Sequence, residues 1–382
     1  MRIDIYHNIR WSRYKARVFS ALYRKAIATK IDIRFTQIAD TIENRTALSN
    51  VELGYHQYPH KLLFPGSYDQ IPKWKLIAIL FFNVIHSKAD LVLIPGYDLP
   101  EYWSMLAAAI LSGKKRGVFC DSTLLDRKQL LIKRIFKRFF FYWCDIFFGY
   151  GIRSRELLMY YGVKSERIFQ RCQAAALPDE YDTINVRESR LRCASFANAH
   201  QFLYVGRLSQ EKGIDTLLYA FAKVHLQIPT SKLILVGSGP QLDELRSLAL
   251  SLGLDMAVEF AGSTNQEKLA THYLCASCLV LPSYSEPWGL VVNEALHYGC
   301  PVVVSDRCGC VPELVQNNLT GYTFKAGDAN DLSSKLLRLV TEFTDLEQVT
   351  DRCLEAISLY TPDAAAEQIL NGCQHILSSN FS

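Results

Sequence analysis

Apolar residues recur along this chain in two patterns that alternate from one segment to the next. Short apolar runs are typical of buried parallel strands, and longer stretches with apolar residues at helical spacing predict helices that pack on a sheet. In the first half, the pattern predicts strands at residues 89–96, 115–121 and 145–151, and helices at residues 74–87 and 101–113. Strands that alternate with helices favour a doubly wound parallel sheet.

The second half repeats this alternation. It has predicted strands at residues 201–205 and 276–282, and predicted helices at residues 215–225 and 290–297. Because 382 residues exceed what one hydrophobic core usually serves, we expect two α/β domains of similar size.

Composition places the domain boundaries. The first domain is predicted at residues 1–180, and residues 181–200 predict a linker because they are polar and poorly periodic. The second domain follows at residues 201–360. Residues 361–382 contain one more helical stretch, with its expected cap around Thr361 and Pro362.

Two glutamates flank a strand-to-helix junction in the segment SYSEPWGLVVNEALHYGCPVV. Glu286 lies in the loop after the predicted strand at residues 276–282, and Glu294 lies one turn into the next helix. Ligands of open parallel sheets bind at this edge, and a helix start presents free N–H groups that favour an anion such as a diphosphate. A lone glutamate near a helix start is a routine dipole partner. The pair, together with Pro287 and Gly289, indicates a site that binds sugar-nucleotide hydroxyls.

A matching pair of cations follows the predicted strand at residues 201–205. Arg207 and Lys212 lie in the loop GRLSQEKG, ahead of the helix predicted at residues 215–225. An arginine fork and a lysine point charge at a strand end suit a pyrophosphate leaving group. The alternative is that both are ordinary solvated loop cations.

These residues are part of a longer pattern: GRLSQEKG, LILVGSGP, VEFAGS and LVLPSYSEPWGLVVNEALHYGCPVVVSDRCGCVPELVQNNLTGYTF. Over roughly residues 200–335 the pattern resembles the carboxyl-terminal half of retaining nucleotide-sugar glycosyltransferases of the GT-B type, in the large family 4 (glycosyltransferase group 1). The resemblance implies two Rossmann-like, doubly wound domains that face an interdomain cleft. The first domain would bind the acceptor and the second the donor, with the terminal helix crossing back to the first.

Carried over by position, the resemblance implies that Arg207 and Lys212 hold the donor diphosphate. It implies that Glu286 contacts the transferred sugar and that Glu294 contacts the ribose hydroxyls. The remaining donor-binding positions that we assign are loop residues and backbone amides at the same strand ends: Gly206, Gly237, Pro287, Gly289, Leu290 and Val291.

The amino-terminal half departs from this family. Relatives usually open with a strand and a glycine-rich loop, but residues 2–22 contain no glycine, so a close backbone approach to the donor is not supported there. Many relatives also place a histidine at the end of an inner strand, where this chain has Cys120, Asp121 and Ser122. Asp121 is the best candidate to position the acceptor or to act as general base, since burial can raise the pKa of an aspartate. The equal alternative is that Asp121 or Ser122 caps the next helix.

The net charge of +4 is mild, but basic residues gather in residues 114–143. Only Asp121 and Asp126 accompany these cations: Lys114, Lys115, Arg116, Arg127, Lys128, Lys133, Arg134, Lys137 and Arg138. Because they interleave with apolar and aromatic residues, the segment could lie on an anionic membrane surface or bind a lipid-linked phosphate. A solvated cationic face over a buried stripe is the equal alternative. Nucleic-acid binding is not expected, because no known binding motif accompanies the cluster.

Eleven cysteines without an export signal favour reduced thiols. The pairs Cys275/Cys278 and Cys308/Cys310 are not expected to form a metal site, since Cys278 enters a predicted buried strand and Cys275 ends a predicted helix. No apolar stretch reaches the ~18 to 20 residues of a spanning helix, and the first residues do not resemble a secretory signal. We expect a cytoplasmic protein, docked peripherally on the inner membrane face if the basic segment binds lipid.

The resulting expectation is a retaining, metal-independent hexosyltransferase that uses a nucleotide-diphosphate sugar, with UDP favoured over GDP. The acceptor would be a glycan, glycolipid or lipid-linked molecule, most naturally in surface polysaccharide biosynthesis. No cofactor is expected, because the nucleotide sugar is a substrate. Two alternatives stay open: a nucleotide-sugar epimerase on the same fold and a non-catalytic membrane-associated scaffold. A plain Rossmann dehydrogenase ranks lower, because the chain lacks a dinucleotide fingerprint.

Overall fold

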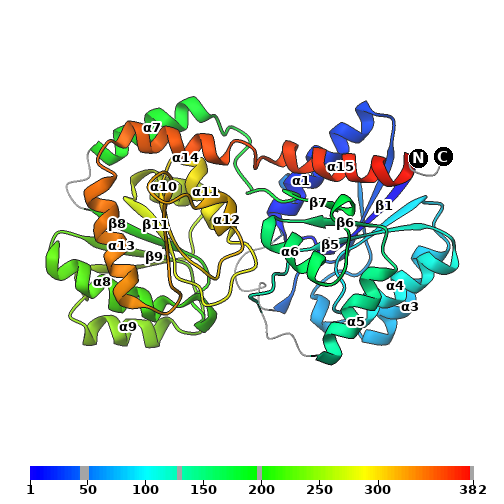
Figure 1. Ribbon diagram of the computed structural model, residues 1–382, viewed down its shortest axis with the longest axis horizontal. Helices are drawn as coiled ribbons and strands as arrows, with labels where there is room; N and C mark the ends of the chain where they lie inside the picture. The colour runs from blue at the N-terminus through cyan, green and yellow to red at the C-terminus, as the bar shows by residue number, and fades with distance from the viewer. Residues whose placement is uncertain (44–50, 127–130, 196–199, 379–382) are drawn as a thin grey trace. The chain divides into compact units, whose positions relative to one another are not determined.

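The computed structural model describes residues 1–43, 51–126, 131–195 and 200–378. The chain divides into two compact units, and each is built on a parallel sheet with helices on its faces (Figure 1). Unit 1 comprises Met1–Ala176 and Tyr360–Ser382, and unit 2 comprises Leu177–Leu359. The predicted α/β class with parallel sheets is confirmed.

Unit 1 contains a seven-stranded parallel sheet in the order β3-β2-β1-β4-β5-β6-β7. Its strands are β1 (Arg2–Ile9), β2 (Asp32–Ala39), β3 (His60–Leu62), β4 (Leu91–Ile94), β5 (Lys115–Cys120), β6 (Ile146–Gly149) and β7 (Ile168–Phe169). One face packs on α1 (Arg13–Ala28) and α15 (Pro362–Ser378). The other packs on α3 (Lys73–Ile85), α4 (Pro100–Leu111), α5 (Leu131–Tyr142) and α6 (Ile152–Tyr160). All three strands and both helices predicted in this half are present.

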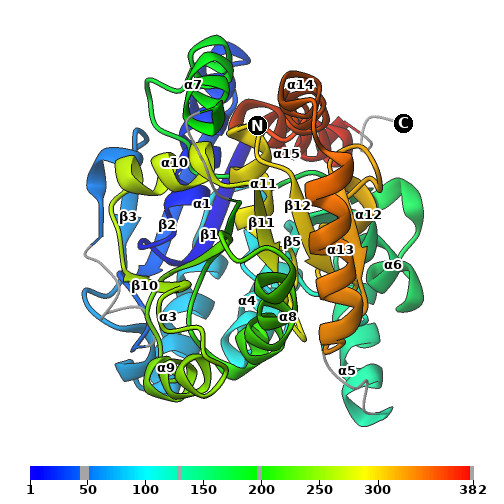
Figure 2. The same cartoon turned by 90° about the vertical axis from the view of Figure 1, so that its left-hand side faces the viewer.

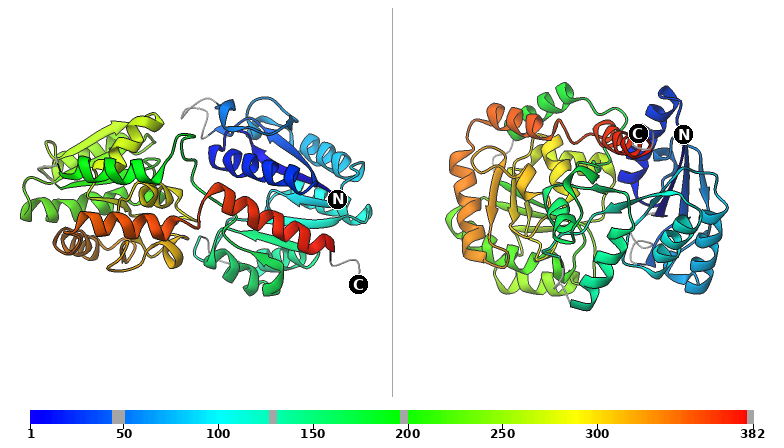
Figure 3. Two further views of the ribbon diagram at one scale, coloured as in Figure 1. Left: turned by 90° about the horizontal axis from the view of Figure 1, so that it is seen from above. Right: turned by 45° about the vertical axis from the view of Figure 1, so that its right-hand side comes forward.

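The carboxyl-terminal helix α15 belongs to unit 1, where it lies beside α1 and against β6 (Figure 3). Gly372 makes this close approach possible. A Cβ atom at this position would lie 2.6 Å from the ring of Phe148 on β6, so a larger residue would push the helix off the sheet.

Unit 2 contains a six-stranded parallel sheet in the order β10-β9-β8-β11-β12-β13. Figure 2 labels β10, β11 and β12 of this sheet. Its strands are β8 (Gln201–Val205), β9 (Lys232–Val236), β10 (Val258–Gly262), β11 (Cys278–Leu281), β12 (Val302–Ser305) and β13 (Gly321–Phe324). Helices α8 (Ile214–Gln227), α9 (Leu242–Ser251) and α13 (Ala329–Glu342) share one core with this sheet. Four further helices contact one another: α7 (Thr183–Ser195), α10 (Gln266–Cys275), α11 (Leu290–His297) and α14 (Leu346–Ile357). Of these, α10 also contacts β8, and α11 contacts β11 and β12.

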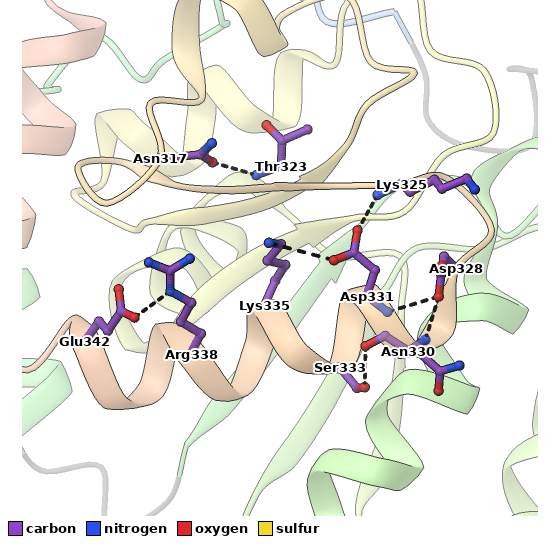
Figure 4. A network of polar contacts seen from close by, with 10 residues as sticks. All are labelled: Asn317, Thr323, Lys325, Asp328, Asn330, Asp331, Ser333, Lys335, Arg338 and Glu342. Atoms are coloured by element: carbon purple, nitrogen blue, oxygen red, sulfur yellow. Dashed lines mark hydrogen bonds and ion pairs between the residues drawn. The ribbon is translucent and has the colours of Figure 1, made fainter.

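The start of α13 is fixed by a polar network (Figure 4). The Asp328 carboxylate caps the helix by accepting the N–H groups of Asn330 and Asp331, both at 3.0 Å. The Asp331 carboxylate in turn accepts the N–H of Lys325 at 2.8 Å, just after β13. These bonds hold the helix against the end of the strand.

The linker predicted at residues 181–200 is wrong over most of its length, because Thr183–Ser195 forms α7 inside unit 2. The helix is anchored by Arg190, which is buried and donates to three carbonyl oxygens at the end of α10, 2.6–3.2 Å away. A buried arginine that bonds to carbonyls replaces an apolar stripe here, so the sequence pattern carried no helical signal. Residues 196–199 lie outside the described residues.

The basic segment at residues 114–143 does not form one surface. Lys114 is buried, and Arg116 is paired with Asp145 at 2.7 Å, whereas Arg127 and Lys128 lie outside the described residues. Among the cations of this segment whose side chains are described, the exposed ones are Arg134 and Arg138 of α5. None of the helices in the described residues is both long and apolar enough to cross a membrane.

Candidate active site

The strand order of unit 2 brings the two predicted loops together. Strands β8 and β11 are neighbours in the parallel sheet, so the loops that follow them leave the same edge. Gly213, after the short 3-10 helix Gln210–Lys212, has a left-handed φ of 64°. A Cβ atom there would lie 2.3 Å from the carbonyl oxygen of Pro282. The glycine thus lets the first loop pack directly on the end of β11.

Lys212 and Glu286 form an ion pair across these two loops. Their side chains are only 21% and 16% exposed, so the pair is mostly shielded from water. The family resemblance implies that Lys212 binds the diphosphate and that Glu286 contacts the sugar. The structure brings the two groups into direct contact, and any anion that approaches Lys212 competes with Glu286 for its ammonium group.

The Glu286 loop is supported from two sides. The indole N–H of Trp288 donates to the side chain of Asn293 at 2.8 Å, which ties the loop to α11. The N–H groups of Gly309 and Cys310 donate to the carbonyl oxygens of Glu286 and Trp288, at 2.9 and 3.0 Å. These bonds fix the Glu286 loop relative to α11 and to the segment that contains Gly309 and Cys310.

Gly309 holds the Glu286 loop in place and was not predicted from the sequence. A Cβ atom at this residue would lie 1.8 Å from the carbonyl oxygen of Pro287, so only glycine permits the contact between the two loops. In the sequence the position is visible only as the glycine of the motif CGC, between Cys308 and Cys310. Cys308 and Cys310 are buried residues that flank this glycine.

Helix α11 begins at the predicted position, next to the ion pair. Gly289 precedes it with a left-handed φ of 100°, and no side-chain hydrogen bond caps the helix. The N–H groups of Leu290 and Val291 have no acceptor within the helix, because they belong to its first turn. The helix start therefore offers donors and a positive dipole end near Lys212 and Glu286.

Glu294 lies one turn into α11, as the sequence predicts, and its carboxylate accepts the hydroxyl of Tyr273 at 2.7 Å. Burial and the nearby Glu294 carboxylate hold the pKa of Tyr273 well above its usual range. The tyrosine therefore stays protonated and keeps donating to Glu294. This bond fixes the position of one carboxylate oxygen.

Arg207 differs from Lys212 in having no salt bridge within the described residues. Its backbone is held by Tyr204, whose hydroxyl donates to the Arg207 carbonyl oxygen at 2.8 Å. Gly206 and Gly237 are also predicted to bind the donor, but their backbone N–H groups donate hydrogen bonds within the protein. The N–H of Gly206 donates to Val236, and the N–H of Gly237 donates to Gly262, at 3.0 and 2.8 Å. These two amides are therefore not free to bind a diphosphate, unlike those at the start of α11.

Asp121 lies in unit 1, directly after β5. Surrounding protein raises its pKa and the ammonium of Lys15 opposes the rise. The residue is exposed, so water screens both effects. The turn after Asp121 is closed by Asp126, which accepts the N–H and hydroxyl of Thr123 at 2.6 and 2.8 Å. Residues 127–130, which precede the next helix, lie outside the described residues, so the alternative that Asp121 or Ser122 caps that helix stays open.

The loop geometry of unit 2 coincides with a sequence-family match. Residues 188–351 match the family described as glycosyl transferases group 1. The match covers less than half of the chain and marks this segment as similar to the group 1 glycosyltransferases. It contains both loops, the Lys212–Glu286 pair and all of α11.

Among similar proteins, an uncharacterized glycosyltransferase, MJ1607, of Methanocaldococcus jannaschii is 31% identical over 170 residues, which are 44% of this chain and 43% of that protein. A GDP-mannose-dependent alpha-(1-6)-phosphatidylinositol monomannoside mannosyltransferase of Mycobacterium tuberculosis is 30% identical over 145 residues, 36% of this chain and 37% of that protein. The matched segment thus spans less than half of each relative.

The likeness to solved structures extends over the whole chain. The Anabaena protein Alr3699/HepE, solved in complex with UDP, superposes with a TM-score of 0.74 at 17% identity, covering 98% of this chain and 100% of that one. At this identity the likeness concerns the fold alone, and it confirms the predicted GT-B fold. The group 1 glycosyltransferase segment accordingly occupies the second of the two Rossmann-like units.

Proposed function

We propose that this protein is a retaining glycosyltransferase that moves a hexose from a nucleotide-diphosphate sugar to an acceptor without a metal ion. The observation that carries the proposal is the Lys212–Glu286 pair at adjacent strand ends, inside the segment that matches the group 1 family. A cation and a carboxylate side by side suit a donor that presents a diphosphate next to sugar hydroxyls.

The leaving diphosphate is the group that gains charge as the glycosidic bond breaks. In the proposed mechanism it is stabilised by Arg207, Lys212 and the first amides of α11, and such preorganised donors are worth a few kcal/mol each. Glu286 takes the hydroxyls of the transferred sugar once the diphosphate has drawn Lys212 away. Glu294, positioned by Tyr273, binds the ribose hydroxyls.

Retention follows if the acceptor attacks on the face that the leaving group vacates, with the departing phosphate helping to take the proton. In this scheme Asp121 positions the acceptor or serves as its base. We favour UDP over GDP as the nucleotide, supported by the UDP complex of the structurally similar Anabaena protein. The GDP-mannose dependence of the mycobacterial relative keeps GDP as the second candidate.

The exposed side chains of α5 support the proposal that the acceptor lies at a membrane surface. It exposes apolar and aromatic side chains next to cations, with Ile135 70% and Tyr142 76% exposed. We call this surface the α5 patch, formed by Arg134, Ile135, Phe136, Arg138, Phe139, Tyr142 and Trp143. Aromatic residues beside cations fit the interface of an anionic membrane. Peripheral docking on the cytoplasmic face would bring a glycolipid or lipid-linked acceptor within reach, as in surface polysaccharide assembly.

A nucleotide screen tests the proposal directly. UDP, GDP, ADP and TDP are added to the full chain, and the melting temperature is measured, because a ligand that binds only the folded state raises it. We expect UDP, or failing that GDP, to give the largest rise. Incubation of the protein with the matching nucleotide sugar should then consume donor only when acceptor is present. Donor conversion without any acceptor would favour an epimerase instead, and no response to any nucleotide would contradict a donor site.

A further inference from the structure

The first turn of α1 in unit 1 holds a lysine in an unusual place. Lys15 is the third residue of the helix and is only 4% exposed. Its ammonium lies over the rings of Phe119 and Tyr150, 4.8 and 5.1 Å from their centroids. Phe119 is on β5 and Tyr150 directly follows β6, so the ammonium lies at the carboxyl edge of the parallel sheet, where ligands of such sheets bind.

Neighbouring cations differ from Lys15 in having a carboxylate partner. Arg10 pairs with Asp40 at 2.6 Å, and Arg13 pairs with Glu52. The Lys15 ammonium has no hydrogen-bond acceptor among the described residues. The carboxylate of Asp121 contributes to its electrostatic surroundings but forms no ion pair with it.

Three features make a cation unfavourable at this position. It is buried, it lacks an acceptor, and it adds positive charge to the positive end of a helix dipole. The helix start also has no side-chain cap and no acidic residue in its first turn. The contacts with two aromatic rings offset only part of this cost. An anion bound at the helix start would satisfy the ammonium and the first N–H groups together.

We propose that Lys15 and the first turn of α1 bind an anionic group of the acceptor, either a phosphate or a carboxylate. The inference rests on the proposed function, since it names the acceptor class of that transferase. The donor diphosphate is already assigned cations and helix amides in unit 2, so the Lys15 site serves a second charged group. It lies where relatives carry a glycine-rich loop that this sequence lacks.

Lys114 provides a matched control. It is the other described lysine that is buried, 8% exposed, and it directly precedes β5, at the opposite edge of the same sheet, with its ammonium 3.5 Å from the carbonyl oxygen of Ile85. Lys15→Met and Lys114→Met remove the same charge and keep a similar volume. Both variants are first checked for folding by circular dichroism and thermal melting.

The test uses inorganic phosphate as the probe, in a full-length chain that also carries Arg207→Ala and Lys212→Ala to disable the proposed diphosphate site. We expect phosphate binding, measured by calorimetry and thermal shift at pH 7, to weaken at least tenfold in the Lys15→Met chain and to stay unchanged in the Lys114→Met chain. The same titration with acetate in place of phosphate shows whether the site binds a carboxylate or a phosphate. Equal phosphate binding with and without Lys15, or equal loss in both variants, would overturn the inference.

A second experiment distinguishes an acceptor-binding role of Lys15 from a donor-binding role. In the chain with Arg207 and Lys212 intact, Lys15→Met should bind UDP as tightly as the unmodified protein. A tenfold loss of UDP affinity would assign the Lys15 site to the donor diphosphate and overturn the acceptor assignment. Failure of UDP, GDP, ADP and TDP alike to bind the unmodified protein would instead contradict the proposed function, whatever phosphate does at Lys15.

Discussion

The ammonium of Lys212 and the carboxylate of Glu286 join the loop after β8 to the loop after β11. Both groups are also proposed to bind the donor. The Glu286 carboxylate therefore pairs with the same ammonium group that the donor diphosphate would bind. Donor binding must therefore exchange one anion for another at Lys212.

This competition gives Glu286→Gln an unusual expected effect. Removing the carboxylate frees Lys212, so UDP should bind about threefold to tenfold more tightly, the size expected for a partly shielded ion pair. Transfer of the sugar should fall at least a hundredfold, since the hydroxyl contacts are lost. Calorimetry with UDP and a transfer assay measure the two effects separately. Weaker UDP binding in this variant would show that Glu286 does not compete for Lys212.

Lys15→Met should stabilise the protein, because burial lowers the pKa of Lys15 from 10.5 to about 8, while Asp121 opposes the shift only in part. That difference corresponds to about 3 kcal/mol in the free energy of unfolding. The folded state disfavours the charged form, so the cost is fully present below pH 8 and disappears as the pH rises from about 8 to about 10.5.

Denaturant unfolding of the unmodified protein and Lys15→Met, measured from pH 7 to pH 10.5, tests this expectation. The variant should be more stable at pH 7, and the difference should vanish at the alkaline end. A variant that is less stable at pH 7 would mean that Lys15 is held by a favourable ion pair with Asp121.

Gly309→Ala should damage the donor site through the backbone. The added Cβ would lie 1.8 Å from the carbonyl oxygen of Pro287, so the Glu286 loop must move. We expect a loss of about 1 to 3 kcal/mol in stability and loss of UDP binding with the fold retained. Gly54→Ala is the control, because nothing lies within 4 Å of its Cβ position. Unchanged UDP affinity in Gly309→Ala would show that the loop contact does not set the site.

The α5 patch should bind anionic vesicles. Replacing Phe136 and Phe139 by aspartate removes two exposed aromatic rings and adds repulsion, so binding to vesicles of phosphatidylserine and phosphatidylcholine should fall at least tenfold in a sedimentation assay. Leu226→Asp, at an 83% exposed position on α8, should leave it unchanged. Equal binding by the Phe136/Phe139 variant would show that this face is only a solvated surface.

Strands and helices with strong apolar patterns were predictable from the sequence. The helix Leu290–His297 has the predicted bounds, and β8, β11, α3 and α4 lie where the pattern placed them. Helix α7 was not predictable, because a buried polar residue, Arg190, anchors it. Hydrophobic periodicity carries no information about an arginine that binds carbonyl oxygens.

The candidate site was predictable in its residues but not in its contacts. Parallel-sheet topology placed Lys212 and Glu286 at one edge, whereas their direct pairing depends on the φ of Gly213 and on loop packing. Lys15 could have been found, since it shares the apolar stripe of α1 with Phe19, Leu22 and Ala26, where a lysine is out of place.

The central claim is that Lys212 forms the cationic centre of a nucleotide-diphosphate site. Calorimetric titration of UDP, or of GDP if UDP does not bind, tests it most directly in the unmodified chain, Lys212→Met and Lys335→Met. Lys335 is a fair control, since it is also in unit 2, is 26% exposed and pairs with Asp331 at 3.8 Å. We expect at least a tenfold loss of affinity in Lys212→Met and none in Lys335→Met. Affinity within twofold of the unmodified protein in both variants would contradict the claim.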